Sequence, residues 1–539
     1  MTRLLLIGTV CLSALALASA GSSASPLCVG GPHCYATIQA ALDAAHDGDT
    51  VSVGPGTFAG GVTITKSIQL VGVAAAATVI RGGGPVVTIG SPTSSPTVTL
   101  ANLTITGGLA TTNPQAPRCG PDVPSCGPGY ADATALGGGI EAFQGTTVTI
   151  TRSVITGNRA VPALSTQSVK AVCPGPVACP ASFGDAAGID NWGTMTIVDS
   201  TVSDNHTAAV QSNGGGIATE QGSSLTIANS RVTGNSANAV APYGRFVQGG
   251  GIYADRGSTL TITGSNVDGN SANLTSSIPH PYPMQDGGTD QSNALSGGIH
   301  ASDGVAVSIR NSTLNGNSVS VSNPVGEPFG GDAAMCSCGS AVLTLENAQV
   351  RDNSVTVNVL DTADSGPSGP GALEVDSDAT IANVRFTGNS TVATAANGDA
   401  GALGALLFLF DGTNPPTITN SSISDNVATA SAPNGAATIQ GGGLVNNGPL
   451  TLTNVAVERN HGTAYGLSGF AQGGGIWNGQ LFGGPSSPLT LVNTQVKSNV
   501  LEGSAGLTLQ GGGIFTPGFP PTLTSSVVRH NAPDDCVGC

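Results

Sequence analysis

One string of about 22 residues returns along most of the chain and constrains its fold more than any other feature. Residues 249–270 read GGGIYADRGSTLTITGSNVDGN, and close versions begin at Gly214, Ser296 and Gly441. Each copy ends in an asparagine, and these asparagines recur roughly every 37 residues, a period typical of stacked repeats. The sequence therefore predicts one elongated solenoid rather than several globular domains. The terminal asparagines are Asn158, Asn205, Asn235, Asn270, Asn317, Asn353, Asn389, Asn426, Asn460, Asn499 and Asn531.

Each copy contains short runs of Val, Ile, Leu and Thr in which apolar and polar residues alternate, as in strands with one buried face. In residues 249–270 we expect Ile252, Leu260, Ile262 and Val267 to point inward. A coil that advances one strand per turn supplies the long connections that parallel strands need and pairs every internal strand on both sides. We therefore predict an all-β parallel β-helix of about 13 rungs over residues 49–531.

A second asparagine column stands six residues before the first, with Asp199 in its place once. Asparagine tolerates a left-handed turn, and its amide can bond the same amide one rung away. We interpret both columns as structural. The members of the second column are Asn229, Asn311, Asn347, Asn383, Asn420, Asn454 and Asn493.

The N-terminus has Arg3, an apolar run over residues 4–18 and the small residues Ala-Ser-Ala at 18–20. This pattern predicts a signal peptide over residues 1–20, because the run is too short for a confident membrane span. We expect the mature chain to be secreted or held at the cell surface, without membrane insertion. The net charge of −16 argues against nucleic acid and acidic membranes as partners, since both require a basic face.

Ten cysteines remain after the signal and fall into five near neighbours. Even numbers at local spacing in an exported chain predict disulfides that close small loops. The last pair lies in a C-terminal tail over residues 532–539. The predicted pairs are Cys28/Cys34, Cys119/Cys126, Cys173/Cys179, Cys336/Cys338 and Cys536/Cys539.

The N-terminal segment, residues 21–48, contains Ile38, Leu42 and Ala45 at helical spacing, which predicts a short capping helix before the first coil. The stretch TIQAALDAAHDGDTVSVGPGTF, followed by ITKSIQLVG, resembles the start of pectin-lyase-like proteins. That resemblance implies a right-handed parallel β-helix, and many proteins of this fold cut acidic polysaccharides by β-elimination. The GGGI and xxN repeats are similar to those of polymorphic outer-membrane proteins, although only Phe386 keeps the Phe that usually opens xxN there.

Each repeat is longer than one turn requires, and the excess always falls between the terminal asparagine and the next GGGI. These segments are rich in Ala, Pro, Ser and Gly, so we expect loops stacked along one edge of the first sheet. Long loops gathered on one face often form the binding face of a repeat protein. Examples are residues 108–136, 159–187, 271–295 and 354–370.

If the Ile of each GGGI points inward, the next residue points outward and forms a column from rung to rung. Glu141 and Asp190 then lie on adjacent rungs. Two carboxylates there could share a proton or a calcium ion, or divide the roles in sugar hydrolysis; otherwise they are two solvated acids. We name this set the GGGI column: Glu141, Asp190, Ala218, Tyr253, His300, Cys336, Glu374, Leu407, Val445, Trp477 and Phe515.

On three consecutive rungs, His300, Cys336 and Glu374 of this column are joined by Cys338 and Asp376, which stand two residues after Cys336 and Glu374 and point outward on the same sheet. Two thiolates, an imidazole and a carboxylate could make a tetrahedral zinc site. In an oxidising compartment the two cysteines would instead form a disulfide, with His300 merely exposed.

The aromatic residues Tyr253, Trp477 and Phe515 could offer flat faces for sugar rings, or be covered by loops. An eliminating enzyme needs a base near the acidic carbon of the sugar, and lysines are scarce in this chain. Arg256, one rung below His300, is the best remaining candidate for that base.

We expect a non-catalytic exported protein of the cell surface or extracellular matrix, monomeric and without a resident cofactor, that presents loops for adhesion or glycan binding. If it does bind a cofactor, we expect calcium. The alternative is a polysaccharide lyase or glycoside hydrolase on the outer face of the first sheet, with Arg256, His300, Glu141 and Asp190 as its catalytic candidates.

Overall fold

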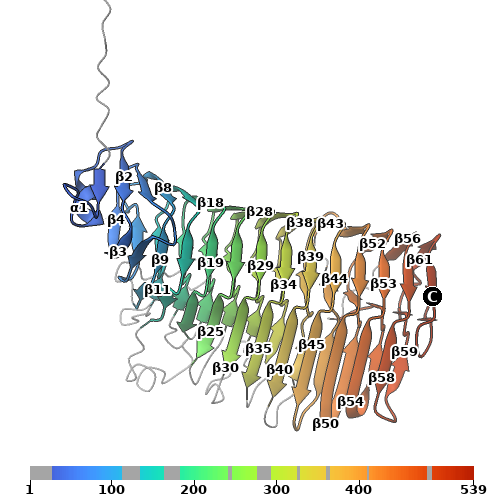
Figure 1. The fold of residues 1–539 in the computed structure, drawn as a ribbon. Helices are drawn as coiled ribbons and strands as arrows, with labels where there is room; N and C mark the ends of the chain where they lie inside the picture. Colours follow the sequence, from blue (N-terminus) through green and yellow to red (C-terminus); the bar gives the residue numbers. More distant parts are fainter. Residues whose placement is uncertain are drawn as a thin grey trace, which may run out of the picture.

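The computed structural model describes residues 27–111, 134–162, 183–209, 211–240, 246–275, 293–323, 328–359, 365–409, 412–481 and 488–539. In these ranges the chain folds into short parallel strands and one helix, α1 (Ile38–Ala44). The strands stack into five sheets that follow the long axis of the molecule (Figure 1). The predicted parallel β-helix is confirmed.

The repeat that begins at Gly249 contributes one strand to each sheet, and we name the five sheets by the place of these strands in the repeat. After GGGI come β27 (Ile252–Ala254) in the GGGI sheet, β28 (Thr259–Thr263) in the middle sheet and β29 (Asn266–Asp268) in the xxN sheet. After the terminal asparagine, β30 (Ser271–Thr275) belongs to the outgoing sheet and β31 (Asn293–Leu295) to the return sheet. The chain then enters the next GGGI.

The sheets extend further than the limits expected for the coil. Among the described residues, the middle sheet has 15 strands and begins with β1 (Leu27–Val29), before the helix. The GGGI sheet has 14 strands and ends with β63 (Cys536–Val537), inside the predicted tail. The coil therefore starts before residue 49 and continues past residue 531.

The main core lies between the GGGI, middle and xxN sheets. Ile252 pairs with Ile217 on one side and Ile299 on the other, so like residues stack along the axis. Ile252, Leu260, Ile262 and Val267 are all fully buried in this core, as predicted. The alternation of strand residues thus directs the expected set inward.

In their described parts, the segments expected to be loops form strands. Residues 271–295 begin with β30 and end with β31, and residues 354–370 begin with β40 (Ser354–Val359) and contain β41 (Ser365–Ser368). The outgoing strands form the lower row in Figure 1. Small apolar residues between the outgoing and return strands form separate cores, which make a second lobe: one cluster contains Ala237, Ala239, Val247, Ala272, Leu274, Ala294, Val319, Val321, Ala333, Val355 and Val357.

The glycines of GGGI lie at a waist between the main core and this lobe. Gly249 adopts a left-handed turn with φ of 63°. A Cβ on Gly250 would stand 2.1 Å from the carbonyl oxygen of Ser271, and one on Gly251 would stand 3.0 Å from the amide of Asn270. In this rung a side chain at Gly250 would collide with the backbone of the outgoing strand, whereas the rung after next has room for Ala333 and Ala334 at the equivalent positions.

Both asparagine columns are structural ladders, as interpreted from the sequence. The eleven terminal asparagines form an unbroken file in which each side-chain amide donates to the oxygen of the next, at 2.8–3.1 Å. Asn353, for example, is fully buried and also donates to the Leu314 carbonyl at 2.9 Å. The second column is exposed and left-handed: Asn347 has φ of 52° and donates to Asn311 at 3.2 Å.

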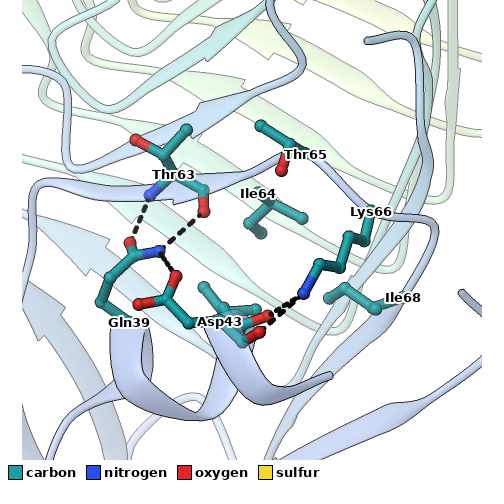
Figure 2. Close-up of a pocket in the computed structure, with 8 residues that line it drawn as sticks. Gln39, Asp43, Thr63, Ile64, Thr65, Lys66 and Ile68 are labelled. Carbon is teal, nitrogen blue, oxygen red and sulfur yellow. Dashed lines mark hydrogen bonds between the residues drawn. The ribbon is translucent and has the colours of Figure 1, made fainter. Parts of the chain in front are cut away.

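Helix α1 packs its apolar face on the first coil. Ile38, Ala41 and Leu42 belong to the main core. The Lys66 ammonium donates to the carbonyls of Asp43 and Ala45 at 2.7 and 2.6 Å, which places a cation at the negative end of the helix (Figure 2). A pocket of about 240 Å³ lies between this helix and the strand that precedes Lys66.

Three predicted disulfides lie within the described residues and are formed: Cys28–Cys34, Cys336–Cys338 and Cys536–Cys539. Cys119, Cys126, Cys173 and Cys179 lie outside the described residues, as does the predicted signal peptide over residues 1–20. In the part of the chain that the structure covers, no helix is long and apolar enough to span a bilayer.

Candidate functional site

The GGGI column is a single ladder in the structure. Strand pairing sets Glu141 beside Asp190, Tyr253 beside His300, and His300 and Glu374 on either side of Cys336. The predicted neighbours are thus confirmed at the backbone level. The column continues through Leu407, Val445 and Trp477 to Phe515.

The expected solvent exposure of this column is wrong. Asp190 and Cys336 have no exposed surface, His300 has 4% and Glu141 has 9%. The return strands and the turns after them cover the column: Ser296 lies 3.3 Å from His300 Nδ1, and Trp477 donates to Gln472 at 3.4 Å. The column therefore lies in the angle between the GGGI and return sheets.

Glu141 and Asp190 occupy adjacent rungs, but Asp190 is engaged from its own strand. The indole of Trp192 donates to Asp190 Oδ2 at 3.0 Å. Because both acids are buried, the alternative of two solvated carboxylates does not hold. Their burial also keeps a polymer chain from reaching them.

Tyr253 and His300 stack on each other, with ring centroids 5.6 Å apart and planes within 5° of parallel. Burial lowers the pKa of His300 to about 4, so its imidazole is neutral near pH 7. Burial, and then the charge of Asp255, raise the pKa of Tyr253. One face of the Tyr253 ring is therefore already occupied, which reduces the area that a sugar could use.

Trp477 and Phe515 do not present flat faces to solvent. They are 4% and 7% exposed and pack with Leu403, Leu407 and Val445 in a small apolar cluster. The prediction that these two rings bind glycans fails for that reason. The loop-covered alternative describes them correctly.

Arg256 lies in an exposed turn after β27, away from the buried column. Its guanidinium pairs with Asp303 of the next rung at 3.5 Å, and both side chains are about half exposed. A guanidinium stays protonated in proteins and has no acceptor, so Arg256 is a poor general base.

The zinc ligands predicted from sequence come together, but not as free thiols. Nitrogen and sulfur atoms of His300, Cys336 and Cys338 lie within 4.8 Å of one another. The two sulfurs are bonded to each other, so neither is available as a thiolate. The predicted zinc site thus requires reduction of this pair.

A group that the sequence did not reveal lies next to this pair. We name Asp332, Glu374 and Asp376 the carboxyl cluster. Asp332 is fully buried, and one of its oxygens, one oxygen of Glu374 and the Cys336 sulfur lie within 4.8 Å of one another. Glu374 and Asp376 point to the same side because they are two residues apart at the end of β42 (Leu373–Val375).

The carboxyl groups of this cluster are strongly perturbed. Burial raises the pKa of Asp332 to about 8, with Asp376 adding repulsion, and burial and Glu374 raise the pKa of Asp376 to about 8. Burial also raises the pKa of Glu374 well above its usual value. Asp332 was missed because it replaces glycine: it has φ of 62°, at the place where Gly249 has φ of 63°.

The same column changes chemistry along the molecule. From Glu141 to Glu374 it is mostly polar or titratable, and from Leu407 to Phe515 it is apolar. Both halves have the same backbone pairing, so the fold itself does not demand charged groups there. The polar half is therefore the candidate functional region.

No protein-family model and no curated protein sequence matches this chain. Among solved structures, the chain is similar to a pectin methylesterase variant in complex with a hexasaccharide, at 10% identity and a TM-score of 0.22, over 73% of this chain and 82% of that one. It is also similar to the A-module of an Azotobacter vinelandii mannuronan C-5 epimerase, at 14% identity and a TM-score of 0.25, over 91% and 93%. At these TM-scores the fold assignment rests on the strand pairing of the chain itself. The likeness to outer-membrane-protein repeats stays a prediction.

Proposed function

We propose that this protein is an exported, non-catalytic scaffold that presents the tip of its second lobe to a polysaccharide or surface glycan. The observation that carries the proposal is the shared edge of that lobe. The outgoing strands stay in register up to their last residues, as Val240 with Thr275 and Asn323 with Val359, so these strands end at one edge. Connections from successive repeats therefore start along one line.

The neighbouring return strands support the same reading. Asn293 pairs with Phe329 and with Phe246, so the return strands also begin along one line. Loops held on a rigid base at fixed spacing suit a ligand that repeats, such as a polysaccharide. The stacked amide ladders behind them supply the rigidity.

Two features favour binding over cleavage. The His300 imidazole is buried under Tyr253, and Arg256 is tied to Asp303. A catalytic base needs to approach the proton that it removes, within hydrogen-bond reach of the bound polymer.

The test is retention and depolymerisation of a panel of plant, algal and microbial polysaccharides by the mature chain. We expect retention on at least one of them without shortening of the polymer. Replacing residues 276–292, between β30 and β31, by a Gly-Ser linker of equal length should weaken retention. Arg310→Ala, on the middle sheet, is the control and should leave retention unchanged. If the chain cleaves any of these polymers and His300→Gln abolishes the cleavage, the protein is an enzyme and the scaffold proposal is wrong.

A further inference from the structure

The carboxyl cluster contains oxygens that are buried and unsatisfied. Within the described part of the chain, neither oxygen of Asp332 nor Asp376 Oδ1 has a hydrogen-bond donor other than the carboxyl group of Glu374. Asp376 Oδ2 accepts from the Gly339 amide at 2.8 Å. The neighbour that approaches Asp332 is Glu374, another acid, which donates only when it carries a proton.

Burying carboxylate oxygens without partners is costly, so such groups are normally paired, protonated or bound to a metal. No ion pair among the described residues includes Asp332, Glu374 or Asp376. Three acids in contact therefore lack the positive charge that would balance them. Either protons or a cation must supply it.

We infer that Asp332 and Glu374 of this cluster bind one divalent cation, with calcium as the ion that their carboxylate donors fit best and Asp376 as a neighbouring acid. All available donors are carboxylate oxygens, which suit hard cations such as Ca²⁺. The sulfur of Cys336 is nearby but is bonded to Cys338, which removes the soft donors that would favour zinc.

Two members of the cluster lie partly at the surface. Asp332 is fully buried, whereas Glu374 and Asp376 are partly exposed. Calcium takes six to eight oxygen ligands, so water at the exposed side would complete its shell.

The position suggests a structural role for the ion. Asp332 belongs to the turn that follows return strand β36 (Phe329–Gly331), whereas Glu374 lies on the next rung of the GGGI sheet. An ion bound by both joins the second lobe to the main coil at the polar half of the column.

The experiment uses the mature chain treated with EDTA and exchanged into buffer at pH 7.5. Calcium chloride is titrated in while heat of binding and thermal unfolding are measured. We expect one saturable site and a higher melting temperature, with no comparable effect of sodium at equal ionic strength. Magnesium and zinc are the comparison ions. If calcium does not raise the melting temperature, the inference is overturned. A response to zinc that requires reduction of the cysteines would also overturn it.

Asp332→Asn keeps the size of the side chain and tolerates the left-handed backbone, so it is the diagnostic variant. It should weaken calcium binding by about tenfold or more, because ligand charge sets affinity in such sites. Asp352→Asn is the matched control, since Asp352 is left-handed too but its side chain is 71% exposed. Should Asp332→Asn not fold, Glu374→Gln tests the same prediction. Equal calcium affinity in the wild type and a folded cluster variant would refute the site.

Discussion

The buried asparagine ladder allows a sharp test of what holds the rungs together. Asn353 has no exposed surface, and its oxygen accepts from the backbone amide of Asn317 at 2.9 Å. Its Nδ2 donates to the Leu314 carbonyl at 2.9 Å and to Asn389 at 2.8 Å. The Asn353 oxygen also accepts from Asn317 Nδ2 at 3.1 Å, so Asn353→Ala removes four bonds at once, although Asn317 Nδ2 keeps its bond to the Val267 carbonyl.

The magnitude follows from the groups left behind. The Asn317 amide and the Leu314 carbonyl both lose a partner in a site closed to water. Each unsatisfied buried group costs about 1–3 kcal/mol, so the free energy of unfolding should fall by about 4 kcal/mol. The Asn389 oxygen keeps the backbone amide of residue 353 and adds little.

The assay is urea unfolding followed by far-UV circular dichroism, with Asn347→Gly as the control. Asn347 lies six residues earlier, is exposed and left-handed, and bonds only the exposed column. Glycine keeps its backbone conformation, so the control should lose less than about 1 kcal/mol. If the two variants unfold at the same urea concentration, the buried ladder is not a main source of stability.

Three further predictions concern other parts of the fold. Val267→Asp places a charge in the main core and should lower the free energy of unfolding by about 4 kcal/mol or more; an unchanged melting temperature would refute the strand register. His300 has a lowered pKa, so its contribution to stability is present above pH 6.5 and is lost as the pH falls towards about 4. His300→Gln should therefore remove about 3 kcal/mol of the acid-induced loss, measured by urea unfolding at pH 7 and 4; equal losses in the two proteins would contradict this. Lys66→Met removes the cation at the end of α1 and should cost about 1–2 kcal/mol in thermal unfolding, whereas Lys497→Met, on a surface pair, should cost less than about 1; equal losses would argue against the helix-end role.

Much of the coil was readable from sequence because each inward residue repeats on every rung. Ile252, Leu260 and Val267 were placed by alternation alone, and the GGGI column was aligned by counting from its isoleucine. Sequence position sets which residues neighbour each other in a parallel stack. Sequence position does not show which other segments of the chain cover those residues.

The second lobe was missed because its strands have the composition of loops. Residues 271–275 read SANLT and residues 427–432 read VATASA, in which Ala, Ser and Asn have low strand propensity. They are strands because each pairs with an equivalent segment above and below. That lobe covers the GGGI column, so burial of Trp477 and the role of Asp332 could not be predicted without it.

The terminal asparagines also give the molecule a net dipole along its long axis. Every side-chain amide in the file donates toward the C-terminal end, so their dipoles add along the axis instead of cancelling. At the last rung, Asn531 donates to the carboxylate of Asp535 at 3.0 Å, which places a negative charge on the positive end of the file. The file therefore ends at an exposed acid of the same chain, in the way an acidic side chain completes the N-terminus of a helix. A second molecule that stacked on this end would find the last amide of the ladder already hydrogen-bonded to Asp535.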